Sequence, residues 1–186
     1  AKMYPGGFLL ELSETIDGIE QTLQYSIEER NELFLDLAEN YRREGLYEKY
    51  LEPVAQLAEQ LSEQGIDDEV VKEWREFEVQ FLKYQPLMRR FLLTELYADS
   101  LKPEGNLEEM VVQVQWIAME YTMIRHSLFL KWMQDGCRDL AYETVRDYMV
   151  VVSRMTGYEE DDIYEYLENS FEHIIWDWGY FALICG

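Results

Sequence analysis

Residues 106–136 read NLEEMVVQVQWIAMEYTMIRHSLFLKWMQDG, and this stretch decides the fold class. Asn106 and Glu109 have the spacing of a capping box, in which two side chains satisfy backbone N–H groups at the start of a helix. Apolar residues then recur on several sides of the helix as far as Met133, and Gly136 is a helix-stop signal. We therefore expect a long and largely buried helix here.

The other long segments carry the same period. Apolar residues recur three and four positions apart, and the alternation typical of half-buried strands is almost absent. The pattern predicts further helices over residues 8–24, 26–45, 47–64, 67–99, 138–155 and 159–184. We expect an all-α fold, a single bundle of six to eight helices that forms one domain over residues 1–186, with a candidate subdivision near residues 65–68.

Local signals place several helix ends. Ser26 and Glu29 form a second capping box, which is expected to start the helix over 26–45. Asp67 or Asp68 is expected to cap the helix over 67–99, and Pro86 must kink or divide that helix. The expected buried residues of this helix are Val71, Trp74, Phe77, Phe81 and Leu82.

The composition is strongly acidic. The chain has 38 Asp and Glu residues against 16 Lys and Arg, a formal net charge of -22, yet 48% of it is hydrophobic, which is enough to build a core. Such a surface repels the phosphates of nucleic acids and anionic lipids, so we expect neither as a partner. It attracts a basic protein segment, a cation or an amine-bearing substrate; the alternative is that the acid only keeps the protein soluble.

Cysteine usage and hydropathy bear on the compartment. Cys137 and Cys185 lie far apart without CxxC companions, so neither a disulfide framework nor a zinc ribbon is indicated. No apolar run approaches the roughly 18 residues that a membrane span needs. These features favour a soluble protein of the reducing cytoplasm.

The two histidines, His126 and His173, are the first candidates for a metal site. A di-iron helical bundle needs a Glu three residues before each ligand histidine, but Met123 and Ser170 occupy those places. We therefore predict no metal site and expect His126 to make a structural hydrogen bond.

Arg125 lies on the long apolar helix, where a buried guanidinium needs a carboxylate. Asp139, Glu143 or an acid near Glu172 is the expected partner. The alternative is that Arg125 holds an anionic group of a ligand in a cavity, although no phosphate-binding loop accompanies it.

Other candidate sites have simpler interpretations. The acidic run 159–162 lacks the residue order of a calcium loop, and a decorated helix N-terminus is favoured. Near the C-terminus, core packing is favoured over an aromatic cage for a cation formed by Trp176, Trp178, Tyr180 and Phe181. The sequence lacks Gly-rich phosphate loops, a nucleophile elbow and Cys/His pairs, so the residues alone leave open whether the chain is an enzyme.

Five short segments carry a family resemblance. They are YP at 4–5, SIEER at 26–30, YTMIR at 121–125, SR at 153–154 and YFALI at 180–184. Taken in order, they resemble the Tyr-Pro element, the Glu-Arg helix opening, the Tyr-x-x-x-Arg helix, the Ser-Arg pair and the closing apolar stretch of the flagellin lysine-N-methylase family, in its C-terminal helical part.

The resemblance implies a role in transferring methyl groups from S-adenosylmethionine to lysines of flagellin. It also implies a cysteine-rich part associated with an iron–sulfur cluster, which is not in these 186 residues. We therefore expect a helical substrate-binding or scaffold portion rather than a complete catalyst, with S-adenosylmethionine as a cofactor only through the resemblance. The expected partner is a basic or lysine-bearing protein segment, with flagellin as the candidate. The residues expected to contact a ligand or partner are Tyr121, Arg125, Ser153 and Arg154.

Two other functions fit the same residues. One is a non-catalytic acidic adaptor or chaperone-like bundle that binds a basic or amphipathic segment in a groove between helices. The other is a ligand-sensing bundle detached from a DNA-binding head, which predicts a closed pocket of roughly several hundred Å³.

Overall fold

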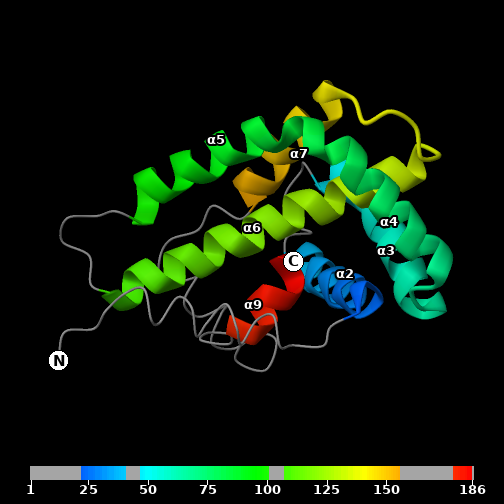
Figure 1. Cartoon of the computed structure of the whole chain (residues 1–186), viewed down its shortest axis with the longest axis horizontal. Coiled ribbons are helices and arrows are strands. Elements are labelled where there is room, and N and C mark those ends of the chain that lie inside the picture. Colours follow the sequence, from blue (N-terminus) through cyan, green and yellow to red (C-terminus); the bar gives the residue numbers. More distant parts are fainter. Residues whose placement is uncertain (1–21, 41–46, 101–106, 156–177, 186) are drawn as a thin grey trace.

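The computed structural model of the chain describes residues 22–40, 47–100, 107–155 and 178–185 (Figure 1). Every secondary-structure element within these ranges is helical, which confirms the expected all-α fold. Several expectations lie outside the described residues: the helix over 8–24 up to residue 21, the end of the helix over 26–45 beyond residue 40, the capping of the long helix by Asn106, and most of the helix over 159–184 with the acidic run 159–162.

The long helix α6 (Leu107–Gln134) runs through the centre of the molecule (Figure 1). Its side chains are buried without a break from Thr122 to Leu130, so neighbours cover it on several sides, as its sequence predicted. The helix ends where Gly136 (φ 77°) and Cys137 (φ 57°) take positive φ values. The Cys137 N–H donates to the Trp132 carbonyl at 3.0 Å, which satisfies a carbonyl of the last turn.

Helix α2 (Leu23–Asn40) begins three residues before the predicted start. Thr22 supplies the first contacts, because its Oγ1 accepts the Tyr25 N–H at 3.2 Å and its carbonyl accepts the Ser26 N–H at 3.1 Å. Ser26 is buried within the first turns and donates its hydroxyl to the Leu183 carbonyl. The predicted capping box at Ser26 is therefore wrong, because this hydroxyl serves a tertiary contact.

Gly65 and Asp67 mark the boundary between the next two helices, and the expected cap by Asp67 or Asp68 is confirmed for Asp67. Helix α3 (Glu52–Gln64) follows the π-helical turn η1 (Tyr47–Leu51) and ends at Gly65, whose φ is 80° and whose N–H donates to the Leu61 carbonyl at 2.9 Å. Helix α4 (Asp68–Phe81) is capped by Asp67, whose carboxylate accepts the N–H groups of Glu69 at 3.0 Å and Val70 at 2.9 Å.

The segment predicted over 67–99 is divided near Pro86. A 3-10 turn, η2 (Leu82–Tyr84), separates α4 from α5 (Gln85–Glu95), and Pro86 lies in the first turn of α5, where its missing N–H is tolerated. The π-helical turn η3 (Leu96–Ser100) continues α5. Leu82 is 54% exposed, so its predicted burial is wrong, because it follows Phe81 by one residue, about 100° around the helix, and so lies outside the face that Phe77 and Phe81 bury.

Helix α7 (Tyr142–Met155) begins later than the predicted Arg138. The preceding chain is held to α4 and η2 instead, because the Leu140 N–H donates to Gln80 Oε1 at 2.7 Å and the Tyr84 hydroxyl donates to the Leu140 carbonyl at 2.6 Å. The last described helix is α9 (Trp178–Cys185).

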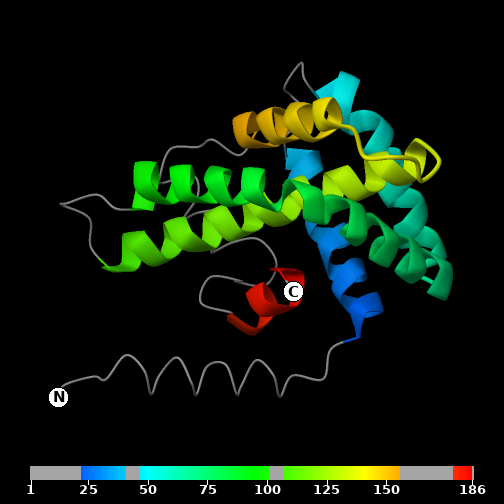
Figure 2. The same ribbon diagram turned by 45° about the horizontal axis from the view of Figure 1, so that its top comes forward.

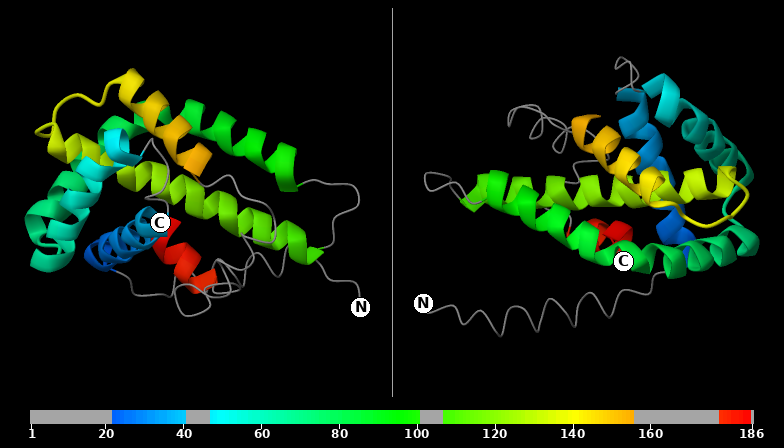
Figure 3. Two further views of the ribbon diagram at one scale, coloured as in Figure 1. Left: turned by 180° about the vertical axis from the view of Figure 1, so that it is seen from behind. Right: turned by 90° about the horizontal axis from the view of Figure 1, so that it is seen from above.

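Helices α5 and α7 lie on one side of α6, and α9 lies on the other side beside α2 (Figures 2 and 3). The core is centred on Trp74, which is fully buried and packs against Phe77 and, edge to face at 4.8 Å between ring centroids, against Phe129. No helix among the described residues combines the length and the apolar character that a membrane crossing requires.

Candidate functional site

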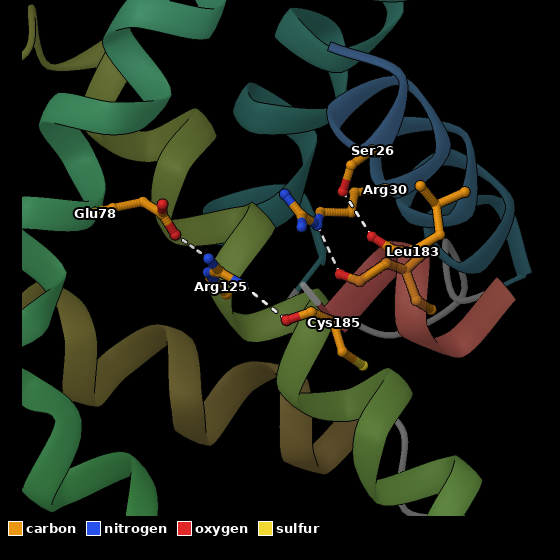
Figure 4. A network of polar contacts seen from close by, with 7 residues as sticks. Ser26, Arg30, Glu78, Arg125, Leu183 and Cys185 are labelled. Atoms are coloured by element: carbon orange, nitrogen blue, oxygen red, sulfur yellow. Dashed lines mark hydrogen bonds and ion pairs between the residues drawn. The ribbon is translucent and has the colours of Figure 1, made fainter. Parts of the chain in front are cut away.

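Three buried side chains hold the C-terminal end of α9 (Figure 4). Ser26 Oγ donates to the Leu183 carbonyl at 2.6 Å, Arg30 Nε donates to the Ile184 carbonyl at 2.6 Å, and Arg125 Nη1 donates to the Cys185 carbonyl at 3.2 Å. The last carbonyls of a helix have no partner within the helix and carry partial negative charge. The two guanidinium groups therefore donate hydrogen bonds to these carbonyls and balance their partial negative charge. As a result, α9 is anchored between α2 and α6.

The two guanidinium groups also flank Trp74. The carbon Cζ lies 4.6 Å from the ring centroid in Arg30 and 5.1 Å in Arg125, which is cation–π range. Burial lowers the pKa of both arginines, and the charge of Arg125 lowers the pKa of Arg30 further. Arg30 is fully buried, so its charge is stabilised by these contacts within the protein.

Arg125 forms an ion pair with Glu78 of α4 (Figure 4). The sequence suggested other acids, but Asp139 lies on the surface, 3.7 Å from Lys83, and Glu143 is exposed. Residue 172 lies outside the described residues. The expected structural pairing of Arg125 with a carboxylate is present, with a different partner.

The structure brings together only part of the predicted site. Tyr121 precedes Arg125 by one turn of α6 and is half-buried, and burial raises the pKa of its phenol while the charge of Arg30 lowers it. Ser153 and Arg154 lie at the end of α7, where Arg154 is exposed. This pair therefore lies on a different helix from Tyr121 and Arg125.

Sequence reasoning missed Arg30 as a member of this cluster. Ile27, Arg30, Asn31 and Phe34 follow helical spacing and share the buried face of α2. Arg30 and Asn31 are two polar residues on this otherwise apolar face. They were the signal that could have indicated the cluster, because buried polar side chains need partners.

His126 makes the structural hydrogen bond that its position predicted. The Asn31 amide nitrogen donates to the Ala58 carbonyl at 2.9 Å, so its oxygen accepts from His126 Nε2, 3.1 Å away. Burial lowers the pKa of His126 to about 3, and the charges of Arg30 and Arg125 act in the same direction. His126 is neutral at physiological pH. Within the described ranges, no three His, Cys, Asp or Glu side chains are grouped to hold a metal ion.

The aromatic residues near the C-terminus are only partly described. Phe181 is 5% exposed and belongs to the core, and Tyr180 meets it edge to face with 6.3 Å between centroids. These two residues pack in the core, which is the interpretation that the sequence favoured. Residue 176 and the side chain of Trp178 lie outside the described set.

Two hollows are lined by described residues. A cavity of about 290 Å³ lies between α3, α4 and the end of α6, and its lining consists of Pro53, Gln56, Leu57, Gln60, Glu73, Met133 and Gln134. A second hollow of about 500 Å³ lies on the outer face of α5 and η3. Its lining residues are all exposed: Pro86, Arg89, Arg90, Leu93, Thr94 and Tyr97.

Comparison with known families gives one finding. The family model of the FliB lysine N-methylase C-terminal domain matches residues 8–184. Comparisons with curated proteins and with solved structures give no match.

Proposed function

This chain belongs to the FliB lysine N-methylase C-terminal domain family, and from that premise we propose that it is the helical substrate-binding or scaffold portion of a flagellin lysine-N-methylase-like protein. The family match over residues 8–184 carries the proposal. The role assigned to the chain within such a protein is to hold a lysine-bearing segment of the partner, with flagellin as the candidate.

The charge of the chain supports this kind of partner. The formal net charge is -22, and exposed acids gather on α3 and α4, which flank one end of the molecule (Figure 1). They include Glu63, Asp68, Glu69 and Glu76. A field of this sign attracts lysine side chains and repels nucleic acid and anionic membranes. We place the function in the reducing cytoplasm, because both cysteines are free thiols.

The four predicted contact residues divide into two roles. Arg154 is exposed and Ser153 is partly exposed at the end of α7, so we propose that this pair contacts carbonyl or carboxylate groups of the partner, because the guanidinium group of Arg154 repels its lysines. Arg125 is engaged by Glu78 and by α9, and Tyr121 lies beside it. We propose that these two act indirectly, by holding α9 in place.

The described residues do not fit S-adenosylmethionine. This cofactor presents a nucleoside, which requires a pocket well above the roughly 300 Å³ lower limit of ligand sites. The cavity beside Glu73 is about 290 Å³, and the larger hollow on α5 is lined by six exposed residues, among which no acid could bind ribose hydroxyls. The proposed role of the chain is therefore limited to binding the partner.

Calorimetry on the full chain tests the proposal. A lysine-rich peptide is titrated into the protein, and a peptide with norleucine at each lysine position serves as the control. We expect binding of the lysine peptide that weakens strongly between about 0.1 M and about 1 M salt, as the Debye length falls from about 10 Å to about 3 Å. Equal affinity for both peptides would contradict the proposal.

A second titration separates a cofactor-binding protein from an adaptor. S-adenosylmethionine is titrated into the wild type and into Arg125→Ala. Binding that the substitution abolishes would restore a direct ligand role for Arg125 and overturn its structural assignment. The proposal expects no binding by the described residues, whereas a basic peptide still binds.

A further inference from the structure

The cavity beside Glu73 combines an apolar wall with a polar end. Leu57, Met133 and Pro53 supply apolar surface from α3 and α6. Gln56, Gln60 and Gln134 supply three amide groups, and Glu73 of α4 is the single charged residue of the lining. Ligand sites have this composition, with a mostly apolar wall and a few convergent polar groups.

Glu73 carries a negative charge that no cation in the described part of the chain neutralises. It is half-buried, and its carboxylate accepts only a weak hydrogen bond from the Cys137 thiol, with 3.6 Å between Sγ and Oε1. Burial and the charge of Glu73 raise the pKa of Cys137 to about 11, so the thiol remains a protonated donor.

The neighbouring lysines already have other partners. Lys72 lies 3.7 Å from Glu76, and Lys131 lies 2.6 Å from Asp135. A partly buried carboxylate without a counter-ion attracts a cation, so this cavity favours a positively charged ligand.

The orientation of the amides fits the same ligand. Gln56 uses its nitrogen to donate to Glu52 Oε1 at 3.3 Å, and Gln134 uses its nitrogen to donate to the Pro53 carbonyl at 3.3 Å. Each of these amides keeps one N–H and its oxygen for a ligand, but Gln134 Oε1 already accepts from Lys131 at 3.4 Å, so the Gln56 oxygen is the freer acceptor of the two. An ammonium group has three donors and no acceptor, and it needs such oxygens beside a carboxylate.

From this geometry we propose that the cavity binds a primary ammonium group on an unbranched alkyl chain, with Glu73 as the counter-ion. The alkyl stem lies along Leu57 and Met133, and the ammonium group meets Glu73 and the amide oxygens. A volume of about 290 Å³ suits one side chain of this kind rather than a nucleoside. This inference rests on the proposed function, and it places a lysine side chain of the partner in the cavity beside Glu73.

Nuclear magnetic resonance on the full chain tests the site. The probe is Nα-acetyl-lysine N-methylamide, and the matched ligand with norleucine lacks only the charge. We expect saturable shifts of the side-chain amide signals of Gln56, Gln60 and Gln134 with the lysine probe. The norleucine probe is expected to leave these signals unchanged.

Two variants of equal charge identify the counter-ion. Glu73→Gln removes the carboxylate of the cavity, and Glu76→Gln removes an exposed carboxylate three residues further along α4. We expect Glu73→Gln to weaken the probe about tenfold or more, as the loss of a charge-assisted hydrogen bond does, and Glu76→Gln to weaken it less than about twofold. Glu73→Gln is also expected to fold with at least wild-type stability, because it removes an unpaired half-buried charge.

The outcomes separate this inference from the function on which it rests. Equal weakening by both variants, or equal binding of the norleucine probe, would overturn the site. If the lysine-rich peptide binds Glu73→Gln as tightly as wild type, the site is wrong while the proposed function stands. If the peptide does not bind wild type at all, the proposed function is wrong, and the response of the small probe still decides the site.

Discussion

The burial of His126 predicts that the protein loses stability as the pH falls below neutral. His126 is fully buried, its Nε2 donates to Asn31, and its surroundings include the two guanidinium groups of Arg30 and Arg125. Burial and the two guanidinium charges oppose a charged imidazole, and the pKa in the folded state is about 3 against an ordinary value of 6.5. Protonation is therefore confined to the unfolded chain over most of this interval.

The magnitude follows from linkage. Because the unfolded state binds one more proton between pH 6.5 and pH 3, the free energy of unfolding falls as pH falls through this window, by about 1.4 kcal/mol per unit well below 6.5. The contribution of His126 is fully present above pH 6.5. At pH 5 the loss is about 2 kcal/mol, a large fraction of the stability of an ordinary domain.

The assay is urea unfolding at pH 8 and pH 5, followed by tryptophan fluorescence. His126→Gln keeps an amide donor toward Asn31 and removes the titrating ring, and His173→Gln removes the other imidazole of the chain as a control. Acidic residues titrate alike in all variants, so the difference between variants isolates His126. We expect wild type to lose about 2 kcal/mol more than His126→Gln between the two pH values. Parallel pH profiles of these two proteins, or a His126 pKa above about 5 by nuclear magnetic resonance, would refute the reasoning.

Three further substitutions test local features by urea unfolding. Asp67→Ala removes the cap of α4 and is expected to cost about 1 kcal/mol, whereas Asp68→Ala removes an acid without a cap bond and costs less; equal losses would contradict the capping role. Gly65→Ala places a side chain at φ 80° and ψ 156°, with no atom within 4 Å of the new Cβ. We expect a loss of about 2 kcal/mol in the free energy of unfolding, which comes from backbone strain alone. An unchanged urea midpoint would contradict this strain. Ser26→Ala is expected to lower the free energy of unfolding by about 1 kcal/mol and to speed amide hydrogen exchange in α9. The control Ser62→Ala, at an exposed contact to Glu32, is expected to change neither the stability nor the exchange. Slow exchange in α9 after Ser26→Ala would argue against the anchoring of α9 by Ser26.

Signals within one helix were predictable from the sequence. The course of α6 follows from apolar residues on several sides and from a glycine at its end, and Asp67 and Gly65 act as the local rules expect. Leu82 shows the limit of such rules, because an apolar residue at the edge of the stripe was assigned to the core, whereas the structure exposes it.

The contacts that anchor α9 were not predictable in the same way. Arg30 and the Ile184 carbonyl are separated by 154 positions, and no local pattern links them. With 38 acidic residues in the chain, the sequence could not select Glu78 as the partner of Arg125. Ser26 matched a capping pattern by spacing alone, and its hydroxyl serves α9 because the helix had already begun at Leu23.

Recognition of a lysine ammonium group by this acidic helical bundle is the central proposal. The most direct measurement is a competition in which one labelled lysine peptide is displaced from the full chain by unlabelled peptides with lysine or norleucine at a single position. We expect the lysine peptide to displace the label at about tenfold lower concentration, which is the effect of one charge-assisted hydrogen bond. Displacement by both peptides at the same concentration would show that the bundle does not recognise the lysine ammonium group.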